Sequence, residues 1–122
     1  MPNNNLPHDH GSLANQLLEH MPADDHFQLV ADIFKQLGDG NRIRIFWLLC
    51  HCEECVINIS AMVNMSSPAV SHHLKQLKGA RLITSRRDGK EVYYKAADNE
   101  RAQLLHQMIE QMMKVTCPIK PS

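Results

Sequence analysis

The sequence has no apolar stretch long enough to cross a membrane. Its 122 residues are 43% hydrophobic, but the apolar run over residues 43–50 contains Arg44 and is far shorter than the roughly 20 residues that a spanning helix needs. The polar start, MPNNNLPHDHGS, lacks the hydrophobic core of a signal peptide. We therefore expect a cytoplasmic protein with no membrane partner.

Net charge is also missing, because 13 basic residues balance 13 acidic ones. Zero net charge argues against a polyanionic partner, but the charge is unevenly distributed. Residues 66–95 contain seven basic and two acidic side chains and carry +5, which leaves −5 for the rest. Such segregation can present one basic face to phosphates. A solvated surface with uneven charge explains the count equally well.

The chain shows no internal repeat, and it is long enough for one hydrophobic core but too short for two ordinary domains. We expect one domain over residues 12–117, between a disordered tail at 1–11 and a second tail at 118–122. Apolar periodicity predicts helices over 12–20, from 24 to Gly38, over 42–50 and from about 99 to 115. The expected N-caps are Ser12 for the first helix, Asn41 for the third and Asp98 or Asn99 for the last.

The segment from 57 to 82 is the most informative, since it predicts two short helices joined by a tight turn. The first covers about 58–64, and the second is opened by Ser67 as N-cap and ends at Gly79. Val70, Leu74 and Leu77 face the core, so the opposite face is polar and can enter a major groove. The residues expected to contact DNA from this helix and its start are Ser66, Ser67, Pro68, Ser71, His72, Lys75 and Gln76.

The stretch LITSRRDGKEVYYKA alternates apolar and polar residues on either side of Asp88-Gly89. This pattern predicts a hairpin with a type I′ turn. Arg86, Arg87 and Lys90 flank its tip, and we expect them to contact DNA phosphates. A basic hairpin alone is usually a solvated loop, but directly after two such helices it has the form of a wing.

FKQLGDGNRIRIFWLL followed by SSPAVSHHLKQLKGARLITSRRDGKEVYY resembles the ArsR/SmtB family of small bacterial repressors, over about residues 27–94. The resemblance implies a mainly α fold with a small β-hairpin wing, a dimeric winged helix-turn-helix. It also implies a homodimer that represses double-stranded operator DNA until a metal ion, a metalloid or a reactive sulfur species binds. Gly40-Asn41 departs from the family, which commonly has proline followed by Thr or Ala there.

The last predicted helix carries an apolar stripe made of Leu104, Leu105, Met108, Ile109, Met112 and Val115. The earlier helices already supply a core, so we expect this stripe to pack against the same helix of a second subunit. The alternative is that it folds back on its own domain.

Three of the four cysteines lie in CHCEEC, at Cys50, Cys52 and Cys55. In a reducing cytosol they favour metal ligation, redox sensing or plain buried thiols over structural disulfides, and their spacing can close around one soft ion. Family thiolate sites have a motif resembling E-L-C-V-C-D-L, of which the matching residues 53–59 keep only Cys55, with Ile57 at the second cysteine. The resemblance also allows a redox pair between Cys50 or Cys52 and Cys117.

A second family site on the last helix takes carboxylate and imidazole ligands from both subunits. Asp98 and Glu100 are present, but Gln111 and Lys114 stand where the partner ligands are expected, so we expect no such site. His106 is then expected on the surface or at the dimer interface. The N-terminal histidines could add ligands, although tails often collect histidines without a role; they are His8, His10, His20 and His26.

These patterns favour a DNA-binding repressor that senses its effector at cysteines, and not an enzyme. The only bound group we expect is a thiolate-held effector ion. A thiol redox enzyme is the alternative, but the sequence has no thioredoxin-like βαβ pattern, no glycine-rich phosphate loop and no base for a cysteine nucleophile. A winged helix used only for protein contacts is a third interpretation.

Overall fold

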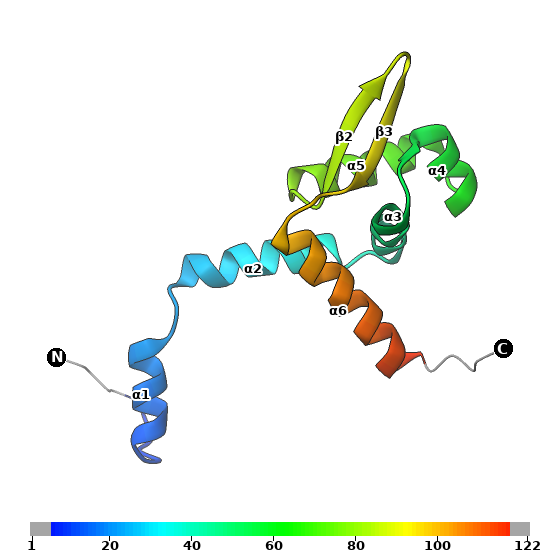
Figure 1. Cartoon of the computed structure of the whole chain (residues 1–122). Coiled ribbons are helices and arrows are strands. Elements are labelled where there is room, and N and C mark those ends of the chain that lie inside the picture. The colour runs from blue at the N-terminus through cyan, green and yellow to red at the C-terminus, as the bar shows by residue number, and fades with distance from the viewer. Residues whose placement is uncertain (1–5, 118–122) are drawn as a thin grey trace. The chain divides into compact units, whose positions relative to one another are not determined.

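The computed structural model describes residues 6–117, which divide into two compact units between Asp32 and Ile33. The first unit contains α1 (Ser12–His20) and the beginning of α2 (Asp24–Gln36), both drawn in blue to cyan in Figure 1. The predicted tails lie partly outside the described residues, at 1–5 and 118–122, and residues 6–11 form no helix or strand. One domain over 12–117 stays a prediction. No helix within residues 6–117 has the length and hydropathy to span a membrane.

Helices α1 and α2 leave their apolar side chains exposed. Neither helix contains a buried residue, although Ile33 and Leu37 pack against the core of the second unit, to which they belong. The bounds predicted for α1 are confirmed, but its predicted cap is wrong, because Gly11 is the N-cap and Ser12 is already helical. The exposed apolar side chains of this segment are Leu13, Leu17, Leu18, Phe27, Leu29, Val30 and Phe34.

The second unit is built from α3 (Gly40–His51), α4 (Val56–Val63), α5 (Ser67–Gly79) and α6 (Glu100–Thr116). The cap predicted for α3 is wrong, because the Asp39 carboxylate, not Asn41, accepts the free backbone N–H of Arg42 at 3.0 Å. The cap predicted for α6 is confirmed at Asn99, which accepts from the backbone N–H of Ala102 at 2.8 Å.

The two helices of the helix-turn-helix are present, with one correction at their junction. Helix α4 ends at Asn64, whose φ of 55° places it in the left-handed region that closes a helix. Ser66, not Ser67, is the N-cap of α5, and its hydroxyl accepts from the backbone N–H of Ala69 at 3.3 Å. Pro68 is therefore the second helical residue and not the first, a position that also needs no N–H donor.

A three-stranded antiparallel sheet follows, in the order β1-β3-β2. The predicted hairpin is confirmed as β2 (Ile83–Asp88) and β3 (Glu91–Ala96), but Asp88 pairs with Glu91, so the loop is Gly89-Lys90. Among the described residues of this loop only Gly89 has a positive φ, of 66°. A type I′ turn needs two such residues, so the predicted turn type is wrong and the loop fits type II′. The short strand β1 (Glu54–Cys55) was not predicted.

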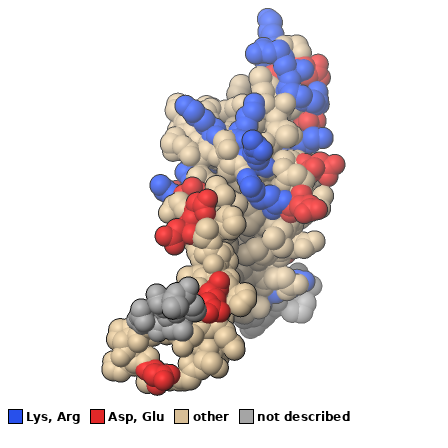
Figure 2. Space-filling model, turned by 90° about the vertical axis from the view of Figure 1, so that its left-hand side faces the viewer, with Lys and Arg blue, Asp and Glu red and all other residues tan. Residues whose placement is uncertain are grey.

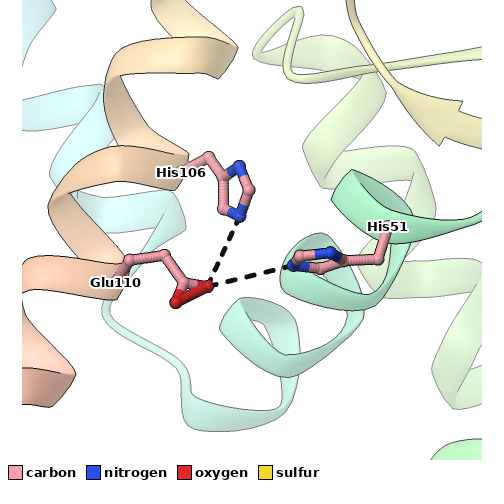
Figure 3. A group of neighbouring side chains, drawn as sticks. All are labelled: His51, His106 and Glu110. Atoms are coloured by element: carbon pink, nitrogen blue, oxygen red, sulfur yellow. Dashed lines mark ion pairs between the residues drawn. The ribbon is translucent and has the colours of Figure 1, made fainter.

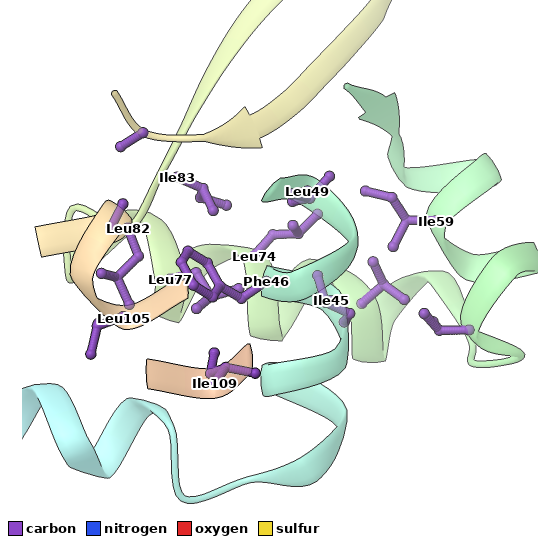
Figure 4. Close-up of a cluster of buried hydrophobic side chains, with 14 residues drawn as sticks. Ile45, Phe46, Leu49, Ile59, Leu74, Leu77, Leu82, Ile83, Leu105 and Ile109 are labelled. Atoms are coloured by element: carbon purple, nitrogen blue, oxygen red, sulfur yellow. The ribbon is translucent and has the colours of Figure 1, made fainter. Parts of the chain in front are cut away.

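The core lies where α3 crosses α5, with α4, α6 and the start of β2 around it (Figure 4). Its most deeply buried side chains are Ile45, Phe46, Ile59, Val70, Leu74, Leu77 and Leu82. This packing fixes one face of α5 against the core and so holds the opposite face outward.

The apolar stripe of α6 divides between two faces. Leu105 and Ile109 are buried in the core of their own unit, so the alternative that the helix folds back holds for them. The side chains that stay exposed are Leu104, Met108, Met112 and Val115. Of the predicted stripe, only these exposed side chains are available to contact a partner subunit.

Candidate DNA interface and sensor sites

Helix α5 presents a polar outer face that its own core contacts hold in place. Val70 and Leu77 are fully buried on the inner side, and the Ser60 hydroxyl of α4 lies 3.2 Å from that of Ser67 and ties the two helices together. Gln76 is half-buried. The other predicted DNA-contacting residues of this region are Ser66, Ser67, Pro68, Ser71, His72 and Lys75. All six are exposed.

The inner side of α5 also carries a buried histidine, His73, which is 7% exposed. The Arg42 guanidinium donates from Nε to His73 Nδ1 at 3.2 Å and from Nη1 to Gln36 Oε1 at 3.1 Å. Burial lowers the pKa of His73, against the raising effect of the nearby Asp39 carboxylate. A neutral imidazole therefore joins α5 to the start of α3 at neutral pH.

The hairpin carries the second group of predicted contacts. Figure 2 shows Lys and Arg side chains gathered at the hairpin's far end and in another group on the face below it. Arg87 and Lys90 are exposed, and neither forms an ion pair with another described residue. Lys78 of α5 donates to the Ser85 hydroxyl at 2.6 Å and links this helix to the wing.

Arg86 differs from its neighbours because an acidic side chain already holds it. Its guanidinium donates from Nε and Nη2 to the two carboxylate oxygens of Glu53, at 2.9 and 2.7 Å. It also lies 4.9 Å from the centre of the Tyr93 ring. The ion pair lowers the pKa of Glu53 and raises that of Arg86, so both groups stay charged, and Glu53 competes with a phosphate for Arg86.

Glu53 belongs to CHCEEC, and this stretch is part of the wing's sheet. Glu54 pairs with Tyr94 and Cys55 with Tyr93 along the β1–β3 ladder. The cysteine segment is therefore connected to the wing by the β1–β3 pairing as well as by the Glu53–Arg86 pair.

The cysteines of CHCEEC are close in sequence, but their side chains do not converge on one position. Cys50 and Cys52 are half-buried, Cys55 is buried, and Cys117 is exposed after α6. Among the described residues, the sulfur atoms of Cys50, Cys52 and Cys55 do not all lie within 4.8 Å of one another. Burial, with the Glu110 carboxylate, raises the pKa of Cys50 to about 11, and burial with Glu54 raises that of Cys52. These thiols must lose protons and approach each other to bind one ion.

A different set of metal-ligand side chains does converge (Figure 3). His51 at the end of α3 points toward His106 and Glu110 of α6, and one ligand atom from each lies within 4.8 Å of the others. The sequence predicts His106 as a surface or interface residue and indicates no separate role for His51. The spacing of His106 and Glu110 at i, i+4 is the only local signal for this group.

Comparison with known proteins fits this arrangement of helices and wing. Residues 39–85 match the sequence profile described as "Bacterial regulatory protein, arsR family". The transcriptional repressor SmtB homolog of Synechocystis sp. is 32% identical over 114 residues, which are 93% of this chain and 86% of that protein. The chain belongs to the ArsR family. This membership confirms the predicted resemblance and favours a transcriptional regulator over an enzyme.

Other ArsR-family relatives match over a shorter span. The HTH-type transcriptional regulator KmtR of Mycobacterium tuberculosis is 35% identical over 82 residues, which are 67% of this chain and 63% of KmtR. The cadmium resistance transcriptional regulatory protein CadC of Listeria innocua is 42% identical over 66 residues, or 53% of this chain and 56% of CadC. The matched residues thus span less than two thirds of either relative.

The fold is shared with a solved DNA-binding domain. The solution structure of a homodimeric winged helix-turn-helix DNA-binding domain from Mycobacterium bovis matches with a TM-score of 0.69 at 26% identity, covering 83% of this chain and 95% of that one. The predicted fold, mainly α with a winged helix-turn-helix, is confirmed.

Proposed function

We propose that this ArsR-family chain is a repressor that binds double-stranded operator DNA as a homodimer. The observation that carries the proposal is the exposed polar face of α5 beside a basic hairpin. Its hydroxyl and imidazole groups suit base edges, and the free cations Arg87 and Lys90 suit phosphates on either side of the groove. The homodimeric DNA-binding domain from M. bovis supports the same use of the fold.

Dimerisation is supported by apolar surface that the unit leaves uncovered. On α6, Leu104 and Met112 are 56% and 63% exposed, while their neighbours Leu105 and Ile109 fill the core. A soluble chain gains free energy by covering such a face, and a two-fold axis lets one face cover itself. Two copies would then place two α5 helices for two half-sites of the operator.

Release from DNA is proposed to start at the cysteines of CHCEEC. A thiolate-bound metal or metalloid ion, or a reactive sulfur species, would draw Cys52 and Cys55 together or modify them. Because Cys55 lies on β1 and Glu53 holds Arg86, this change would reach the wing. The name of CadC links one relative to cadmium resistance, which supports a soft metal ion for this chain.

The proposal is tested with the purified full chain and DNA from upstream of its own gene. Fluorescence anisotropy should show tighter binding to this DNA than to a scrambled duplex. Binding should also weaken as salt increases, and a plot of the logarithm of the association constant against the logarithm of the salt concentration should have a slope of roughly −0.9 per phosphate contact. Native mass spectrometry of the same sample should give the mass of two chains. If the affinity is the same for both duplexes and does not depend on salt, the proposal is contradicted, and the alternative of a winged helix that contacts only proteins is favoured.

A further inference from the structure

We propose that His51, His106 and Glu110 form a binding site for a divalent transition metal ion such as Zn²⁺, Co²⁺ or Ni²⁺. The Glu110 oxygen Oε2 lies 3.5 Å from His106 Nε2 and 3.9 Å from His51 Nε2. Two imidazoles and one carboxylate are a ligand set that these ions accept in proteins. The three ligand atoms are nitrogen and oxygen only, so the site differs in its ligands from the thiols, although His51 lies between Cys50 and Cys52 in the sequence.

The spacing of these atoms is close to that of a bound ion. With metal–ligand bonds of about 2.0–2.2 Å, two ligands of a tetrahedral site lie about 3.3 Å apart. The His106–Glu110 distance already fits, and His51 has to approach by about half an ångström to reach that tetrahedral spacing. Its side chain is 47% exposed, so it can rotate without disturbing the core. That exposure also leaves room for a water molecule as the fourth ligand of a tetrahedral ion.

The surroundings of Glu110 favour a metal over simple ion pairing. The Trp47 indole N–H donates to Glu110 Oε2 at 2.6 Å, and both histidines approach this same oxygen. One oxygen cannot satisfy three donors well, and His106 Nε2 is a buried atom that makes no hydrogen bond to any described residue. Neutral imidazole nitrogens that each direct a lone pair at an ion resolve this conflict. Trp47 then orients the carboxylate, as outer partners of metal ligands do.

The site differs from the one that the family resemblance places on the last helix. That site uses positions 98, 100, 111 and 114 from two subunits, whereas His51, His106 and Glu110 come from one chain and join α3 to α6. A bound ion would fix α6, which carries the exposed apolar face, to the end of the helix that leads into CHCEEC. This regulatory consequence rests on the proposed function, while metal binding itself does not.

Trp47 is the only tryptophan of the chain. Its fluorescence reports directly on the site, because the centroid of its ring lies 4.4 Å from the centroid of the His51 ring. Titration of the full chain with Co²⁺ should quench its fluorescence to saturation at one ion per chain. The same sample should show visible absorption typical of tetrahedral cobalt without thiolate-to-cobalt charge transfer. Such charge transfer would instead place the ion at CHCEEC and overturn the proposal.

Competition of Zn²⁺ between the chain and a chelator then measures the affinity of each variant. We expect His106→Gln and Glu110→Gln to weaken binding at least tenfold, and Trp47→Phe, which removes an orienting donor, to weaken it about tenfold or more. Glu110→Gln keeps an acceptor for Trp47, so its folding should be preserved, and circular dichroism checks this.

The matched controls are Glu100→Gln, which removes a carboxylate of α6 outside the site, and His26→Gln, which removes an exposed histidine of α2. Both should bind Zn²⁺ as tightly as the parent. Unchanged affinity in His106→Gln and Glu110→Gln, or a reduction in the controls equal to theirs, would overturn the site. Because DNA is absent from these titrations, a chain that binds the ion but no operator would contradict the proposed function alone.

Discussion

Glu53 of the cysteine stretch and Arg86 of the wing form a two-point ion pair, with N–O distances of 2.9 and 2.7 Å. The pair holds one of the three basic side chains near the tip against the segment proposed to sense the effector, so Glu53 competes with a phosphate for Arg86. The Arg86 side chain is 52% exposed, so the pair adds little to stability. Its larger effect is expected on DNA affinity.

Glu53→Gln should therefore strengthen binding to all DNA sequences alike and steepen the salt dependence by up to about one unit. The physical reason is that Arg86 loses its two-point partner and keeps only the longer contact to Asp88, at 3.7 Å, so it becomes more available to a phosphate. The measurement is anisotropy over a salt series. Glu91→Gln is the matched control, since it removes one negative charge from the hairpin itself without releasing an arginine. Equal shifts in the two variants would show that only net charge matters.

Met112→Glu should shift the chain from dimer to monomer. Met112 is 63% exposed on α6, and the proposed interface would bury the new carboxylate beside apolar side chains of the partner, at a cost of several kcal/mol. Light scattering at several protein concentrations measures the mass. Gln111→Glu, one residue away and also exposed, should remain dimeric. A dimeric Met112→Glu protein would show that the subunits meet elsewhere.

Stability should depend on pH through His73. Its folded-state pKa lies below the usual value because of burial, so the unfolded chain takes up the proton first as pH falls. The contribution to stability is complete above about pH 6.5 and decreases as pH falls from there toward the lowered folded pKa. Urea unfolding of the parent and of His73→Gln, which keeps an acceptor for Arg42, measures it. We expect a weaker pH dependence in the variant, and identical profiles would contradict this role for His73.

The cysteines are tested one at a time. Cys52→Ser and Cys55→Ser should still bind operator DNA but no longer release it when arsenite, a soft divalent ion or a persulfide is added. Cys117→Ser separates the mechanisms, since a full response favours a local thiolate site and an absent response favours a switch that uses Cys117. If all four single variants, Cys50→Ser included, respond like the parent, the cysteines are not the sensor.

Local signals explain why the helix-turn-helix could be predicted. The apolar period that includes Val70 and Leu74, the proline at 68 and the serines before it all act within one helix, so the sequence alone indicates α5. Even there the predicted cap is one residue too late, because Ser66 and Ser67 are chemically equivalent and only the backbone conformation separates them.

The features that the sequence does not indicate depend on contacts between distant segments. Strand β1 has two residues, which carry no periodic pattern, and it exists because Tyr93 and Tyr94 of β3 offer it a ladder. His51 meets Glu110 only because α6 packs against α3. The spacing within CHCEEC predicts a thiolate site, whereas the fold directs His51 of the same stretch toward α6 (Figure 3).

Discrimination between operator and scrambled DNA by Ser71→Ala and His72→Ala tests whether α5 reads the DNA sequence. Both side chains are exposed on the outer face of α5, so their removal should leave folding intact. Competition anisotropy at fixed salt should show the preference for operator reduced by about 1–3 kcal/mol for each base-specific interaction that is removed, with affinity for scrambled DNA nearly unchanged. Parent-like discrimination in both variants would contradict the assignment of α5 as the recognition helix.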